Sequence, residues 1–199
     1  DEAGRFHAGE AQWMTAGRGL VHSEMPEQES GRMRSFQLWV NLPGREKMTD
    51  PKYQEFAPES IPVATPAPGV TVKVIAVAVG NVIGPIAQPA TDPVYLDVGL
   101  EAGTSWQYLL PEGHNAFAYV FEGAVTLGEG EDARALESKE MAVLGGGDLL
   151  ELRAGNQAAR LIVVAGRPLR EPVMRHGPFV MNTKQELMQA FVDFQEGRF

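Results

Sequence analysis

The chain has 199 residues, 44% of them hydrophobic, a length that accommodates one large domain or two small ones. Its formal net charge of −9, without a basic block, argues against direct nucleic-acid binding, and the longest apolar run, residues 74–79, is too short to cross a membrane. The absence of cysteine excludes disulfides and thiolate metal sites and suits the cytoplasm, or the nucleus as well if the cell is eukaryotic.

Short apolar segments predict an all-β protein. They are separated about every ten residues by the 22 glycines and 14 prolines of the chain, a pattern typical of antiparallel sandwiches and barrels. The expected strands, in chain order, are residues 11–15, 20–24, 35–42, 70–79, 94–100, 116–122, 124–127, 142–144, 149–153 and 160–165.

Two segments depart from this pattern. Residues 44–69 are charged and contain several prolines, and we interpret them as a linker with one helical turn near residues 51–56. Residues 183–199 form the one predicted helix, because Thr183 and Glu186 have capping-box spacing and apolar residues follow with helical periodicity. The predicted domains are therefore an N-terminal unit (1–43), the linker (44–69), a second unit (70–182) and the helix (183–199).

A weak internal repeat supports two similar β units. Gly9 and Ala16 recur in the same order at Gly147 and Ala154, and both shifts are 138 positions (147 − 9 and 154 − 16). At this shift the residues that align with His22 and Glu24 are Arg160 and Ile162. We therefore expect only the first unit to carry a histidine–glutamate pair.

That pair is the strongest candidate for a functional site. A glycine-rich turn leads into the run Leu-Val-His-Ser-Glu, which places His22 and Glu24 two residues apart. In an extended strand residues i and i+2 point to the same face, so the imidazole and the carboxylate enter one space. Such a pair suits a divalent metal, although a lone histidine is more often a packed or turn residue.

The other candidates are weaker. Glu10 and Gln12 lie close enough to orient the ligands, or they belong to a solvated hairpin. His7 precedes a predicted turn and is a poorer ligand. We expect the remaining histidines to have loop and structural roles and the tryptophans to lie in the core or in a pocket wall; these are His114, His176, Trp13, Trp39 and Trp106.

The strand count of the first unit is too small for a closed barrel. It contains about three strands before the linker, against about six in the second unit. Metal sites usually need three or four protein ligands. We therefore expect further strands, and further ligands, on a segment that precedes these residues.

Three segments resemble the pirin family of the cupin superfamily. They read QWMTAGRGLVHSEMP (residues 12–26), FQLWVNLP (36–43) and REPVMRHGPFVMNT (170–183). The resemblance implies two cupin-type β-barrels (double-stranded β-helices), the first incomplete here, followed by a helix. It also implies one non-haem iron in the first barrel, bound by three histidines and a glutamate. His22 and Glu24 match two of these ligands, whereas the family's His-x-His pair is absent from this sequence.

The second barrel departs from the cupin metal motif. Counted from Gly103, the positions of the two motif histidines are occupied by Leu109 and Pro111, which cannot bind a metal. We therefore expect this barrel to be structural or to bind a partner.

The resemblance implies two functions. The first is a dioxygenase that uses Fe²⁺, or another divalent metal, and O₂ to open the ring of a flavonol such as quercetin, with Glu24 also accepting the proton of the substrate hydroxyl. The alternative is an iron-dependent, redox-sensing binding protein that acts as a transcriptional co-regulator or on a metabolic-enzyme partner. A metal-dependent isomerase fits the fold but has no supporting motif.

Overall fold

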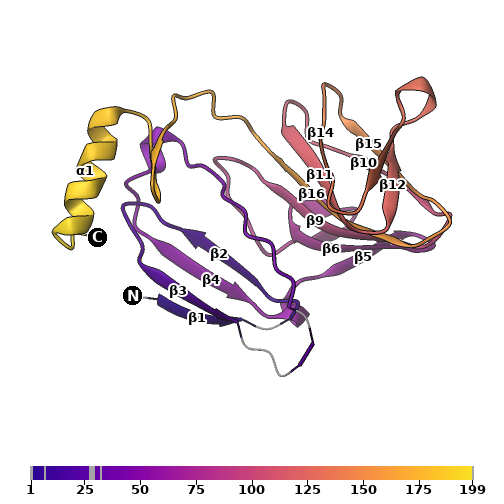
Figure 1. Cartoon of the computed structure of the whole chain (residues 1–199), viewed down its shortest axis with the longest axis horizontal. Helices are drawn as coiled ribbons and strands as arrows, with labels where there is room; N and C mark the ends of the chain where they lie inside the picture. Colours follow the sequence, from indigo (N-terminus) through magenta and orange to yellow (C-terminus); the bar gives the residue numbers. More distant parts are fainter. Residues whose placement is uncertain (1, 7, 27–29, 32, 199) are drawn as a thin grey trace. The chain divides into compact units, whose positions relative to one another are not determined.

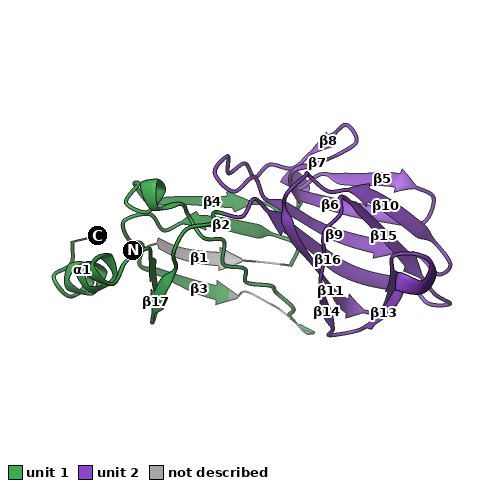
Figure 2. Ribbon diagram, turned by 90° about the horizontal axis from the view of Figure 1, so that it is seen from above, with its two compact units in different colours: residues 1–58, 169–199 green, residues 59–168 purple. Residues whose placement is uncertain are grey.

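The structure is a computed structural model that describes residues 2–6, 8–26, 30–31 and 33–198. These residues form β-strands and one α-helix near the C-terminus, which confirms the predicted fold class. The contacts within the chain define two compact units (Figure 2): unit 1 comprises residues 1–58 and 169–199, and unit 2 comprises residues 59–168. No helix among the described residues combines the length and apolarity that crossing a bilayer requires.

Unit 2 contains two antiparallel sheets, and most of their strands are labelled in Figure 1. The six-stranded sheet has the order β14 (Met141–Val143), β11 (Asn115–Glu122), β16 (Ala159–Gly166), β9 (Val94–Leu100), β6 (Val70–Ala76) and β5 (Val63–Ala67). The four-stranded sheet has the order β10 (Ser105–Leu109), β15 (Leu149–Ala154), β12 (Ala124–Leu127) and β13 (Arg134–Glu137). A short hairpin, β7 (Ala78–Val79) and β8 (Val82–Ile83), follows β6.

The core of unit 2 lies between these two sheets. Along β9 every second residue is buried and the residues between are partly exposed, as expected for a strand with one face against a core. One continuous apolar cluster includes Leu96 and Leu161 from the six-stranded sheet and Leu152 from the four-stranded sheet, all at most 1% exposed. Burial on one face of each strand is therefore what holds the two sheets together.

Unit 1 contains two-stranded ladders instead of large sheets. β1 (Glu2–Phe6) is parallel to β3 (His22–Pro26), β2 (Ala11–Thr15) is antiparallel to β4 (Lys52–Phe56), and β17 (Met174–His176) is antiparallel to β18 (Phe179–Met181). Short 3₁₀ turns lie at η1 (Gly44–Glu46), η2 (Pro58–Ser60) at the boundary with unit 2, and η3 (Gly130–Asp132) in unit 2.

The helix α1 (Lys184–Gln195) begins where the sequence predicts. The Thr183 side chain accepts a hydrogen bond from the Glu186 N–H, and the Glu186 carboxylate accepts one from the Thr183 N–H at 2.8 Å, which completes the capping box. Leu187 is buried, and Phe191 packs edge-on against Phe179 of β18 at a centroid distance of 4.9 Å. The apolar face of the helix therefore docks on the β17–β18 hairpin.

Several expectations from the sequence are wrong. The predicted strand at residues 35–42 has no ladder partner and carries no regular structure. The predicted helical turn at residues 51–56 is instead strand β4, because β2 supplies a partner along its whole length. The linker prediction for residues 44–69 therefore fails at β4 and β5, and the contacts place residues 169–182 in unit 1 instead of the second barrel.

Candidate metal site

The glycine-rich turn before β3 is fixed against the segment that leads into β4. Gly19 N–H donates to Ala16 O at 2.9 Å, and Arg18 N–H donates to Thr49 O at 2.9 Å. Gly17 has a φ of +53°, and a Cβ atom at this position would lie 2.1 Å from Thr49 O. Only glycine fits there without displacing the backbone, so the turn holds the start of β3 in one place.

The structure brings His22 and Glu24 together on β3, as their spacing predicts. The distance from His22 Nδ1 to Glu24 Oε1 is 3.8 Å, and their side chains are 33% and 34% exposed. Gln37 Nε2 donates to the same oxygen, Glu24 Oε1, at 3.5 Å. The pair is therefore neither buried nor fully solvated, and a small ligand can reach it.

The pair fits two positions of a metal site. Nitrogen and oxygen ligands lie about 2.0–2.2 Å from a divalent ion, so two donors on one ion are about 3 to 4 Å apart. The observed 3.8 Å falls in this range. Across the part of the chain that the structure describes, no three His, Cys, Asp or Glu side chains form a group that could hold a metal. His7, the weaker candidate, lies outside the described residues.

The residue that contacts Glu24 is Gln37 and not Gln12, one of the two candidate orienting residues. Gln12 donates to Glu55 Oε1 at 3.4 Å, across the β2–β4 ladder, and not to the candidate ligands. Gln37 makes that contact instead. The available signal was its position in the segment FQLWVNLP, which carries the family resemblance but is remote in sequence from Glu24.

The two described histidines outside the pair have structural contacts. His114 lies in the loop before β11, as expected, and its side chain is only 4% exposed, with Nε2 2.9 Å from Asp92 O. His176 packs edge-on against Phe191 of α1, at a centroid distance of 5.4 Å. Both contacts agree with the structural roles predicted for these residues.

The three tryptophans differ in burial, and not all of them lie in a core or a pocket wall as predicted. Trp106 of β10 is 8% exposed and belongs to the core of unit 2, as expected. Trp13 is half-buried. Trp39, by contrast, is 66% exposed, because the segment around it forms no ladder that would turn one face toward a core.

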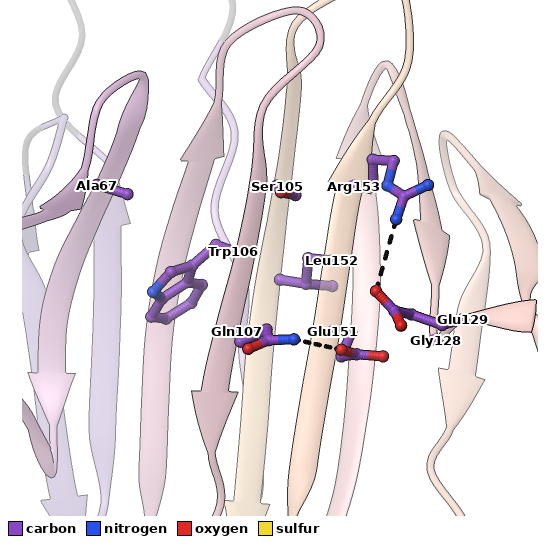
Figure 3. A pocket seen from close by; sticks show the side chains of 9 residues that line it. All are labelled: Ala67, Ser105, Trp106, Gln107, Gly128, Glu129, Glu151, Leu152 and Arg153. Carbon is purple, nitrogen blue, oxygen red and sulfur yellow. Dashed lines mark hydrogen bonds and ion pairs between the residues drawn. The ribbon is translucent and has the colours of Figure 1, made fainter.

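Unit 2 has a hollow of about 240 Å³ along β10 and β15 (Figure 3). Two polar pairs line it: Gln107 donates a hydrogen bond to Glu151, and Arg153 Nη2 lies 3.7 Å from Glu129 Oε1. The volume is below the roughly 300 Å³ at which small-molecule pockets begin. The hollow is lined by Ala67, Ser105, Trp106, Gln107, Gly128, Glu129, Glu151, Leu152 and Arg153, without a histidine. It offers no counterpart of the His22–Glu24 pair.

Comparisons with known proteins define the class and the family. A family described as "Pirin C-terminal cupin domain" matches residues 95–199, and one described as "Pirin" matches residues 1–40. The crystal structure of a quercetin 2,3-dioxygenase from Acinetobacter baumannii superposes with a TM-score of 0.81 and 34% identity, over 96% of this chain and 67% of that one. The fold is therefore that of the cupin proteins.

Two known protein sequences are similar to nearly the whole of this chain. A pirin-like protein from Caulobacter vibrioides is 50% identical over 96% of this chain and 68% of its own length. Pirin from Mus musculus is 41% identical over 98% of this chain and 67% of its own length. The chain belongs to the pirin family, which confirms the resemblance seen in its sequence motifs.

Proposed function

We propose that the protein is an iron-dependent dioxygenase that opens the ring of a flavonol of the quercetin type, and that His22 and Glu24 are two ligands of its metal. The observation that carries the proposal is the 3.8 Å separation of these two side chains on β3, in a segment that matches the pirin family. The name of the similar Acinetobacter baumannii structure supports the choice of reaction and substrate.

The pair has two tasks in this proposal. His22 donates a nitrogen lone pair and Glu24 an anionic oxygen, a mixed set that suits ferrous iron. Bound ferrous iron supplies the redox chemistry that lets ground-state O₂ react with an organic substrate. Glu24 also accepts the proton of the substrate hydroxyl, which leaves the substrate oxygen as an anion.

The experiment measures iron content and oxygen consumption in parallel. The protein is loaded with Fe²⁺ without oxygen, bound iron is determined by mass spectrometry, and O₂ uptake is followed after quercetin is added. We expect uptake that requires both iron and quercetin. His22→Ala should lower both iron content and uptake at least 10-fold.

His176→Ala is the matched control, because His176 is a unit 1 histidine that packs on α1. It should keep the iron and the uptake of the wild type. Equal iron binding by wild type and His22→Ala would overturn the assignment of the ligand. Stoichiometric iron that depends on His22 but gives no uptake would overturn the dioxygenase and favour the alternative, a redox-sensing binding protein with a protein partner.

A further inference from the structure

Gln37 reaches Glu24 from a segment that belongs to no sheet. Residues 33–43, here termed the Gln37 segment, carry no regular secondary structure. Nevertheless the Gln37 amide donates to Glu24 Oε1 at 3.5 Å, the same oxygen that faces His22 Nδ1 at 3.8 Å. We infer that Gln37 is a positioning residue that orients the Glu24 carboxylate toward the metal, a role that rests on the proposed metal site.

One anchor holds the end of the Gln37 segment through a buried lysine. Lys47 is 6% exposed, and its Nζ donates to Asn41 Oδ1 at 2.6 Å and to Val180 O of β18 at 3.1 Å. Both acceptors compensate the ammonium group for the water it loses on burial. Asn41, four residues after Gln37, is therefore tied to the β17–β18 hairpin.

A second anchor lies immediately after the segment. Gly44 N–H donates to Glu171 Oε2 at 2.7 Å, and Asn182 Nδ2 donates to the same oxygen at 2.8 Å. The hydrogen bond from Gly44 and then that from Asn182 lower the pKa of Glu171. The carboxylate thereby joins two segments that are more than 100 residues apart in the chain.

These anchors explain how a segment outside the sheets can support Glu24. Ordering a free glutamine side chain and its backbone would cost more than one exposed hydrogen bond returns. Since the segment is already fixed at its end by Lys47 and Glu171, less of that cost falls on the Gln37–Glu24 contact.

The hydrogen bond from Gln37 leaves lone pairs on the Glu24 carboxylate that can bind a cation. Gln37 occupies one lone pair of Oε1, and among the described residues none donates a hydrogen bond to Glu24 Oε2. A neutral amide restrains the rotation of the carboxylate without competing for the metal, since its N–H group cannot be a ligand. Partners of this kind orient metal ligands, and their loss typically weakens metal binding 10- to 100-fold.

The test compares two glutamines that make similar contacts. Gln37→Met keeps the length of the side chain but removes the donor, and Gln12→Met does the same to the Gln12–Glu55 contact on β2 and β4. Titration with Co²⁺ gives the affinity, and its visible absorption reports the coordination geometry. We expect Gln37→Met to bind Co²⁺ about 10-fold more weakly with an altered spectrum, and Gln12→Met to match the wild type.

A further variant, Gln37→Asn, keeps an amide but shortens its reach and should weaken binding to a similar extent. It also serves if Gln37→Met fails to fold. Wild-type affinity and spectrum in both Gln37 variants, together with weakened binding in His22→Ala, would overturn the role of Gln37 alone. Unchanged binding in His22→Ala would overturn the metal site itself, and the role of Gln37 with it.

Discussion

Unit 2 has a large apolar core, whereas unit 1 has the candidate ligands His22 and Glu24 and almost no core. The continuous core cluster lies entirely in unit 2. Among the described residues of unit 1 only four are buried, and they are Pro43, Lys47, Leu187 and Ala190. The apolar core that stabilises the fold and the candidate metal ligands therefore lie in different units. Metal donors must remain accessible, and burying them unpaired would cost free energy.

Unit 1 uses polar contacts where unit 2 uses apolar packing. Isolated two-stranded ladders are marginally stable, so the ladders of unit 1 need further support. The buried Lys47 and the carboxylate of Glu171 join the segment after β3 to the C-terminal hairpin. Burial lowers the pKa of Lys47, and the charges of Glu171 and Glu186 oppose that shift.

The largest expected effect is on the core of unit 2. Leu161 of β16 is fully buried, so Leu161→Ala should lower the free energy of unfolding by about 2–5 kcal/mol through lost burial and a residual cavity. Urea unfolding measures the change. Leu109→Ala is the control, because Leu109 is 67% exposed and its truncation should change stability by less than about 0.5 kcal/mol. A cost below about 1 kcal/mol for Leu161→Ala would contradict the comparison.

The second prediction concerns the stability of unit 2 at alkaline pH. Burial, and then the nearby Asp97 carboxylate, raise the pKa of Tyr95 to about 12, whereas an unfolded tyrosine titrates near about 10. Between these values the unfolded chain loses the proton first, so stability falls as the pH rises, by roughly 2 kcal/mol. Tyr95→Phe should remove this part of the loss in unfolding measurements from pH 9 to 12. An identical pH dependence in the variant would rule the explanation out.

The smallest effect is expected in unit 1, at the helix cap. Thr183→Ala removes the acceptor for the Glu186 N–H and should cost about 1 kcal/mol. Thermal unfolding monitored by circular dichroism measures the loss. Gln185→Ala, at an exposed helix position, should be nearly neutral. If the two variants were equally stable, the capping box would not support the docking of α1.

Strand predictions were accurate where burial of one face gives the sequence an alternating apolar pattern. They failed where a partner strand, remote in sequence, decides whether a segment forms a strand. Residues 94–100 and 124–127 form strands with the predicted bounds, because one face of each strand contacts the core. The segment 35–42 has strand-like composition but forms no ladder with any described strand, whereas β4 pairs with β2 along its whole length.

The sequence by itself determined the all-β class, the capped helix and the proximity of His22 and Glu24, because each depends on spacing within a few residues. Only the tertiary structure decided that Gln37, and not Gln12, contacts Glu24. It also decided that Lys47 and Glu171 fix the end of the segment that contains Gln37. Contacts between remote segments leave no periodic trace in a single sequence, since they depend on how the chain returns to itself in space.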